Sequence, residues 1–193
     1  MSRLPELTAG EMTPEQRRVH DTIVAGPRGA VRGPLAVWLH RPELAARAQA
    51  LGEYCRFNSS LPKKLSELAI LLTARQWSAE FEWAAHRQHA AEAGLAEDVI
   101  EAIRKGEVPT FSQPDEQAVF DIATTLYREG RLPDALYARG LAALGQDQLI
   151  DLIGVLGYYA LISITINAFE VRPPAGTQAA FADAPEDWNV CFP

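Results

Sequence analysis

Three side chains suited to proton transfer lie close together and share a helical spacing. Glu82, His86 and His89 are separated by four and three residues, so a helix would place them on one face. Glu67 lies on the helix expected before it. Two imidazoles and a carboxylate on one face are sufficient for acid–base chemistry near neutral pH. The same stripe is equally typical of polar side chains that satisfy one another in a core, and the residue types alone leave both interpretations open.

A metal site is a third interpretation of the same residues. Glu82, His86 and His89 would have to point into one cavity to hold a divalent ion. The Glu-x3-His-x2-His spacing on a single helix is a weak signal for that arrangement. We therefore predict no metal at these residues.

The elements that position these side chains are two successive helices. Leu61-Pro62 precedes a helix that extends to about Trp77 and carries Glu67. Ser78 is predicted to cap the next helix, which ends at Gly94. We expect the two helices to pack as an antiparallel hairpin.

The remaining chain also predicts helices, so the expected fold is all-α, a single-domain helical bundle. Start signals such as Thr13-Pro14 and stop signals such as Gly106 predict helices over about 13–24, 41–57, 96–105, 113–129, 133–143 and 147–169. Residues 161–166 resemble a strand in composition, but they continue an apolar segment of helical length. The predicted domain covers residues 1–172, and residues 173–193 form a tail with Phe181, Trp188 and Phe192 that should lie across its own surface or a neighbouring subunit.

Composition excludes several classes of function. The net charge of −7 and the pI of about 5.1 argue against sequence-independent nucleic-acid binding and against an anionic membrane surface. The uncharged stretch from Leu152 to Phe169 approaches the length of a membrane span, but Gly, Ser, Thr and Asn interrupt it and Asp151 and Glu170 flank it. We interpret it as a buried core or interface helix and expect no membrane partner.

Cysteine usage indicates a reduced setting. Cys55 and Cys191 are the only two cysteines, and they are far apart in the sequence, so neither a disulfide framework nor a zinc spacing is present. No basic start followed by an apolar run occurs near Met1, so we expect no signal peptide. A soluble cytoplasmic protein is the simplest prediction.

The hairpin sequence resembles a known family. Leu61-Pro62, Glu67-Leu68-Ala69-Ile70-Leu71, Glu82-Trp83-Ala84-Ala85-His86 and Ala93-Gly94-Leu95 together resemble the carboxymuconolactone decarboxylase family, which includes the alkyl hydroperoxidase D-like proteins. The motifs span residues 61–103, and the order of helices extends the resemblance loosely over residues 34–169. The resemblance implies the helical bundle of that family and a homo-oligomer, a trimer or a hexamer.

The same resemblance disfavours a thiol peroxidase. The peroxidase branch carries Cys-x-x-Cys, then three residues, then the histidine that corresponds to His86, with a glutamate upstream that corresponds to Glu67. In this chain Ala79 and Glu82 stand where those cysteines would be. Attack on a peroxide needs a thiolate, and Cys55 and Cys191 do not have the spacing to replace the missing pair.

The branch without redox cysteines is named for decarboxylation of a carboxylated lactone, which implies His86, Glu82 and Glu67 as catalytic residues. His86 would carry the proton, Glu82 would orient it and stabilise its charged form, and Glu67 would be a second member of a relay. The candidates to hold a substrate carboxylate are four arginines: Arg28, Arg32, Arg56 and Arg75. The Gly/Pro-rich loop around Arg28 slightly favours that residue, although turn formation is the more ordinary role of such a loop. Tyr159 and Asn167 are candidate oxyanion donors, for which a structural hydrogen bond is the favoured alternative.

Two functions from different classes therefore stand, and a hydroperoxidase-like protein without redox cysteines is a less favoured third. One is a cofactor-independent lyase, or an isomerase, that acts on a small carboxylated lactone or a related unsaturated acid. The other is a binding or assembly protein that keeps the helical fold without chemistry. The predicted partners are a small-molecule substrate and further copies of the same chain, with no nucleic acid.

Overall fold

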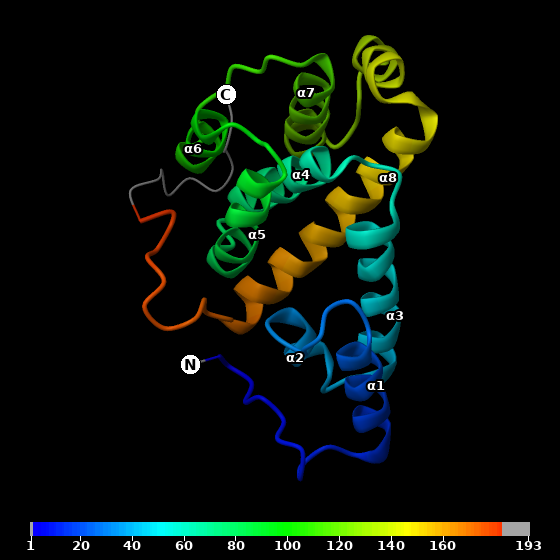
Figure 1. The fold of residues 1–193 in the computed structure, drawn as a ribbon, viewed down its shortest axis with the longest axis vertical. Helices are drawn as coiled ribbons and strands as arrows, with labels where there is room; N and C mark the ends of the chain where they lie inside the picture. The colour runs from blue at the N-terminus through cyan, green and yellow to red at the C-terminus, as the bar shows by residue number, and fades with distance from the viewer. Residues whose placement is uncertain (1, 183–193) are drawn as a thin grey trace.

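The described part of the chain, residues 2–182 of a computed structural model, is built from helices and contains no strand. The all-α prediction is therefore confirmed. In chain order the elements are α1 (Pro14–Ala25), α2 (Pro34–Trp38), α3 (Pro42–Glu53), the π-helical η1 (Tyr54–Asn58), α4 (Lys63–Gln76), α5 (Glu80–Glu92), α6 (Glu97–Lys105), α7 (Pro114–Glu129) and α8 (Asp134–Phe169) (Figure 1).

Helix α4 forms the centre of the bundle. Every residue from Leu65 to Arg75 is buried, because α4 packs against α5, α6, α7 and α8. Burial of eleven consecutive residues means that every face of this part of α4 is covered. The polar residues of α4, Glu67 among them, therefore lie in the interior, where each needs a partner.

Helix α8 crosses the molecule diagonally between α4 and α3 (Figure 1). Its first part and its apolar second part are separated at Gly145, whose φ of 75° and ψ of 171° interrupt the helical backbone, as the separate helices predicted there require. The second part is long and apolar enough to cross a membrane by composition, and 61% of its most apolar stretch is buried inside the fold. Tyr158, Tyr159 and Ile162 of this part face the interior.

Helices α4 and α5 form the expected hairpin, but Ser78 has a different role from the predicted one. The N-cap residue of α5 is Ala79, and no side chain caps the helix. Ser78 has a φ of 46°, in the left-handed region, and its N–H donates to the carbonyl of Arg75. The next N–H, of Ala79, donates to the carbonyl of Ala74. Ser78 therefore ends α4 rather than starting α5, because the turn is too tight to leave room for a separate cap.

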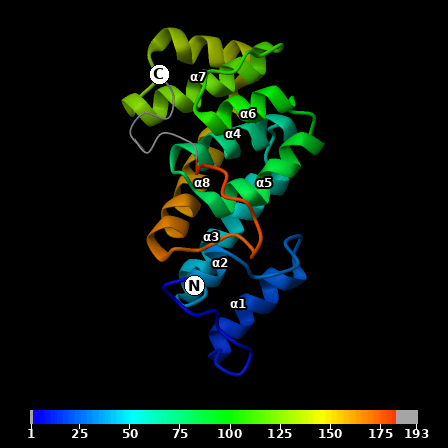
Figure 2. The same cartoon turned by 90° about the vertical axis from the view of Figure 1, so that its left-hand side faces the viewer.

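The N-terminal arm meets the chain at the end of α8. The N–H and guanidinium of Arg3 donate to the carbonyls of Phe169 and Ala168. Residues after α8 run alongside α5, as both side views show (Figures 1 and 2). Phe181 packs on that helix surface, as predicted for the tail, whereas Trp188 and Phe192 lie outside the described residues.

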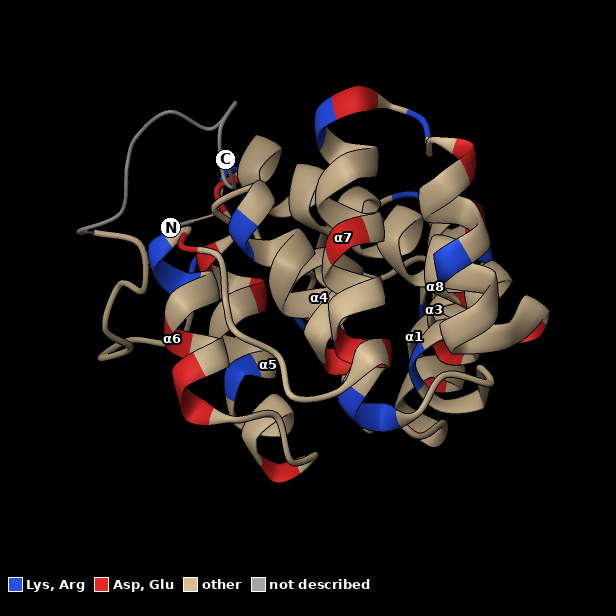
Figure 3. Cartoon of the chain, turned by 90° about the horizontal axis from the view of Figure 1, so that it is seen from above, with Lys and Arg blue, Asp and Glu red and all other residues tan. Residues whose placement is uncertain are grey.

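Charged side chains are interspersed over the helices rather than gathered by sign. Figure 3 shows acidic and basic positions alternating along the elements visible from above. Many are paired in exposed ion pairs, such as Arg47 with Glu43 on α3. Such pairs contribute little to stability, so the informative charges are the buried ones.

Candidate active site

A cavity of about 750 Å³ lies between α5, α8, the loop before α2 and the two chain ends. We call it the His86 cavity. Its floor is formed by Glu82 and His86 of α5 and by Tyr158, Tyr159 and Ile162 of α8. Its other sides are formed by residues from the loop, from η1, from the start of α5 and from both ends of the chain: Glu6, Arg28, Arg32, Arg56, Phe81, Arg172 and Thr177.

The three predicted catalytic residues form one continuous hydrogen-bonded group. The Nδ1 atom of His86 lies 2.7 Å from Oε2 of Glu67, and its Nε2 atom lies 3.0 Å from Oε1 of Glu82. Side-chain exposure is 3% for His86, 5% for Glu67 and 6% for Glu82. Glu82 reaches the ring because it precedes His86 by one helical turn, and Glu67 reaches it from α4 across the hairpin. Glu82 and His86 border the cavity, while Glu67 lies behind them beside a smaller cavity of about 380 Å³.

The two carboxylates favour the charged form of His86. Burial by itself would lower the pKa of the imidazole, but the hydrogen bonds and negative charges of Glu67 and Glu82 outweigh it, so the pKa is raised above the ordinary value of 6.5. Both ring nitrogens can donate only when the ring is protonated. The arrangement therefore favours a protonated His86 held between two glutamates, which is suited to transfer of one proton.

Two tyrosines of α8 complete the floor. The ring of Tyr159 meets the His86 ring edge-on, with centroids 5.3 Å apart. Its pKa lies well above the ordinary value, chiefly because of burial, so the phenol stays protonated and can donate a hydrogen bond. The pKa of Tyr158 is raised to about 12, again chiefly by burial. Both hydroxyl groups are thus neutral donors at the edge of a buried charged group.

Arg28 is placed in the cavity by its contact with Tyr158. Its Nη2 atom donates to the Tyr158 hydroxyl at 3.4 Å. Its Nε atom is buried and has no hydrogen-bond partner within the described structure. A Cβ atom at Gly52 would collide with both the Tyr158 hydroxyl and Nη2 of Arg28, so only glycine fits there. A half-buried arginine with an unused, buried Nε–H beside a cavity is a suitable site for an anion.

Arg56 enters the cavity from the π-helical turn η1. The carboxylate of Asp151 holds both sides of this turn, since it accepts from the hydroxyl of Tyr54, its first residue, at 2.7 Å and from the N–H of Ser60, just after it, at 2.6 Å. π-Helical turns are rare and are frequent at functional sites, where they redirect a side chain. Arg32, from the loop before α2, lines the same cavity.

Two residues predicted to bind substrate lie elsewhere. Arg75 is on α4 like Glu67, but eight residues further along a helix moves a side chain by about 12 Å. Its guanidinium contacts Ser78 and lies over the ring of Phe181, outside the cavity. Asn167 donates to the carbonyl of Trp77 at 2.6 Å and holds α8 to the end of α4. Asn167 therefore makes the structural hydrogen bond that was its favoured alternative.

His89 borders the cavity but is not part of the buried group. Its ring packs edge-on against His86 with centroids 5.9 Å apart, its side chain is 40% exposed, and its Nδ1 atom lies 3.6 Å from Glu92. Within residues 2–182 no group of three or more His, Cys, Asp or Glu side chains is arranged to hold a metal ion. The glutamates on both ring nitrogens also occupy the atoms with which His86 would bind a metal.

Sequence reasoning missed several residues of the cavity. The only signal in the sequence for Phe81 is its position next to Glu82, and the only signal for Tyr158 is its position next to Tyr159. Gly33, with a φ of 58°, lets Phe81 approach the loop closely, because a Cβ there would lie 2.5 Å from the ring. Arg172 follows the last helix and carries no motif. No helical or strand pattern connects these positions, so only the fold brings them together.

Comparisons with known proteins agree with this architecture. The sequence profile of the carboxymuconolactone decarboxylase family matches residues 42–125, which include α4 and α5 and confirm the resemblance in the hairpin. No curated protein matches the chain significantly.

Two solved structures resemble the chain over nearly its whole length. One is an alkylhydroperoxidase AhpD core described as an uncharacterized peroxidase-related protein from Ralstonia eutropha JMP134, with a TM-score of 0.71, 16% identity, and coverage of 90% of this chain and 93% of that one. The other is an uncharacterized peroxidase-related protein from Silicibacter sp. TM1040, with a TM-score of 0.71, 15% identity, and coverage of 90% and 92%. At such low identity the similarity shows the shared fold.

Proposed function

We propose that this chain, which belongs to the carboxymuconolactone decarboxylase family, is a cofactor-independent lyase that removes CO2 from a small unsaturated lactone acid or a related unsaturated acid. The observation that carries the proposal is the buried Glu67–His86–Glu82 group at the edge of a cavity that also contains arginines. A decarboxylase without a cofactor needs a carboxylate site, a sink for the electron pair and a proton for carbon, and each has a candidate here.

The electron pair has a natural path in an unsaturated lactone. The bond from the carboxylate carbon to its neighbour breaks, CO2 leaves, and the electron pair is delocalised over the conjugated system as a dienolate. In this proposal Tyr158 and Tyr159, which line the cavity, donate their neutral hydroxyl groups to the developing oxyanion. Arg28 supplies a guanidinium for the substrate carboxylate.

The proton reaches carbon through Glu82. Both nitrogens of His86 are occupied by glutamates, so the imidazolium does not face the cavity directly with a free N–H. Glu82 borders the cavity and lies on Nε2, so it receives the proton from His86 and passes it to carbon. Glu67 holds Nδ1 and stabilises the charged ring. One proton is consumed for each CO2 released, and solvent restores it.

A thiol peroxidase is the alternative raised by the names of the two similar structures. Ala79 and Glu82 occupy the positions of the expected cysteines, and Glu82 is bonded to His86. Cys55 is buried and lines no part of the His86 cavity. These residues support proton transfer rather than thiol chemistry.

A screen tests the proposed reaction. Purified protein would be incubated with a series of butenolide acids and other unsaturated acids, and CO2 release and ultraviolet absorbance would be followed. We expect at least one acid to lose CO2 without added metal or cofactor. Binding of such acids without any turnover would support the non-catalytic alternative instead.

We also propose a homo-oligomer, a trimer or a hexamer, in the cytoplasm. Exposed apolar side chains of α8 repeat at helical spacing, and others lie on α3 and η1: Ile150, Ile153, Leu161, Ile164, Leu51, Tyr54 and Phe57. Apolar surface of this kind is typical of an interface between subunits. Light scattering at micromolar concentration should give the mass of three or six chains, and the mass of one chain would contradict the proposal.

A further inference from the structure

The segment that follows α8 forms part of the His86 cavity. Residues 171–182 leave the end of α8 and run alongside α5 (Figure 2). Arg172, Pro174 and Thr177 of this segment line the cavity. The segment therefore adds a cationic side chain and a hydroxyl to a site whose other residues come from the helices and the loop before α2.

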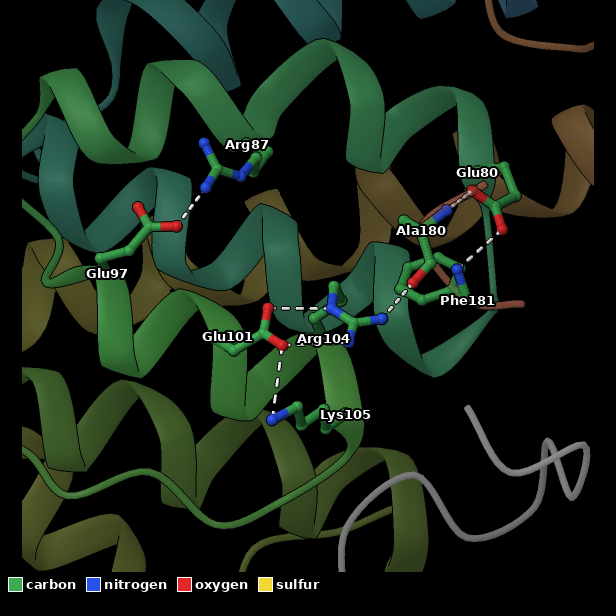
Figure 4. A network of polar contacts seen from close by, with 8 residues as sticks. All are labelled: Glu80, Arg87, Glu97, Glu101, Arg104, Lys105, Ala180 and Phe181. Carbon is green, nitrogen blue, oxygen red and sulfur yellow. Dashed lines mark hydrogen bonds and ion pairs between the residues drawn. The ribbon is translucent and has the colours of Figure 1, made fainter. Parts of the chain in front are cut away.

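Charged side chains form hydrogen bonds with the backbone of this segment at Ala180 and Phe181. The carboxylate of Glu80 accepts from the N–H of Ala180 at 2.7 Å and from the N–H of Phe181 at 3.0 Å (Figure 4). Arg104 donates to the carbonyl of Ala180 at 2.6 Å. Glu101 holds the same guanidinium with two hydrogen bonds of 2.9 and 3.0 Å. Three successive backbone groups are thus bound by ionised side chains, which make the stronger class of hydrogen bond.

The side chain of Phe181 adds an apolar anchor. Its ring meets Trp83 edge-on, with centroids 5.2 Å apart, and the guanidinium of Arg75 lies 5.4 Å from its centroid. Trp83 and Arg75 are both buried. This contact gives buried Arg75 a role that is separate from substrate binding.

We propose that residues 171–182 are a fixed strap that completes the ligand site. In this arrangement Arg172 is a specificity-determining residue that contacts an anionic ligand. Glu80, Arg104 and Phe181 are positioning residues that act through the strap. The anionic class of the ligand rests on the proposed function. The clamp, by which we mean the contacts of Glu80 and Arg104 with the strap backbone and of Phe181 with Trp83, rests on the observed contacts alone. Ordering a twelve-residue segment costs conformational entropy, and the clamp offsets that cost only near its far end. Loss of the clamp should therefore release the whole strap.

Hydrogen exchange tests the clamp without any ligand. Glu80→Ala and Phe181→Ala should each speed amide exchange in peptides covering residues 172–182 by at least tenfold. Glu97→Ala is the matched control, because Glu97 pairs with Arg87 on the same surface without touching the strap (Figure 4). Exchange in the control should equal that of the wild type. Unchanged exchange in both clamp variants would overturn the proposal.

Calorimetric binding tests the ligand role. Butenolide acids are the probe, and the acid that binds the wild type most tightly is used throughout. Arg172→Gln and Glu80→Ala should each weaken its affinity at least fivefold, and Glu97→Ala should not. Equal affinity in the wild type and Arg172→Gln would overturn this inference and leave the proposed lyase intact. Absence of binding by every acid in the wild type would contradict both. If His86→Gln loses turnover while Arg172→Gln binds the acid with normal affinity, the strap proposal alone is rejected.

Discussion

The two walls of the His86 cavity are built in opposite ways. The helical wall is formed by α5 and α8 and is backed by α4, and in it His86 and its two glutamates have fixed partners. The wall of the loop before α2 and the chain ends carries arginines, and Arg28 keeps a buried N–H without a partner. A satisfied group on rigid helices suits precise proton transfer, whereas partly unsatisfied cations on loops suit binding of an anion.

This difference predicts that the helical wall controls rate and the loop wall controls affinity. Substitutions in the first should reduce kcat, because its interactions strengthen in the transition state. Substitutions in the second should raise KM, because a carboxylate clamp is made in the ground state as well. The predictions below test that division.

The largest effect should follow replacement of His86. His86→Gln removes the transferable proton, so kcat should fall by about 10²- to 10⁴-fold, the usual contribution of general acid–base catalysis. The Tm should fall too, because breaking a buried charged group typically costs about 3–5 kcal/mol. Turnover per folded molecule and thermal unfolding should be measured together.

Glu82→Gln should lower kcat nearly as much, since it keeps the shape but removes the carboxylate between His86 and the cavity. His20→Gln on α1 is the control, because His20 lies outside the cavity and pairs only with its neighbour Asp21. A folded His86→Gln protein with full activity would show that the buried group is purely structural.

The pH dependence is the next largest effect. The pKa of His86 is raised in the folded protein by Glu67 and Glu82 against the effect of burial. A raised folded pKa stabilises the fold fully below the unfolded value of about 6.5, and this stabilisation is lost as pH rises through the folded pKa. The free energy of unfolding should therefore decline at alkaline pH, and kcat should decline with it as the imidazolium loses its proton.

Unfolding of the wild type and of His86→Gln, measured between about pH 6 and pH 10, provides the comparison. The gap between the two proteins should narrow as pH rises. A gap that stays constant over this range would show that His86 is neutral in the folded protein.

The helical wall was also the part that the sequence predicted best. Start and stop signals predicted α4, α5 and the break in α8, and the spacing from Glu82 to His86 predicted their contact. Ser78 was misassigned because a residue that ends one helix in a left-handed conformation has the same composition as a cap. Helix α2 has five residues, which are too few for a helical period to be recognised in the sequence.

The loop wall could not be predicted in the same way. Arg28, Arg32 and Arg56 were named as candidates with Arg75, and nothing in the sequence separates the three that line the cavity from the one that lies behind Phe181. The separation depends on which direction each backbone segment turns. Arg172 was missed because it belongs to no helix and is placed by the distant clamp of Glu80 and Arg104.

Replacement of Arg28 should have a moderate effect. Arg28→Gln removes a charged hydrogen bond to the substrate carboxylate, typically about 1.5–3 kcal/mol, so KM should rise about tenfold or more while kcat changes little. The KM of Arg28→Lys should lie between those of the wild type and Arg28→Gln, because lysine keeps the charge but not the forked geometry. Arg18→Gln on the exposed face of α1 is the control. A large fall in kcat with unchanged KM would place Arg28 in the chemical step and break the division between the walls.

The smallest effect on turnover should come from Cys55, which lies on neither wall. Burial raises the pKa of this thiol to about 11, so it stays protonated at neutral pH and is a poor nucleophile. Cys55→Ser places a hydroxyl in an apolar setting and should cost about 1–3 kcal/mol of stability. Its turnover of an unsaturated acid per folded molecule should equal that of the wild type, and so should that of a Cys55→Ser, Cys191→Ser double variant. Neither the wild type nor the two cysteine variants should reduce an alkyl hydroperoxide with a dithiol as the reductant. Peroxide turnover in the wild type that disappears in the double variant would move the chemistry of this protein from the imidazole to sulfur.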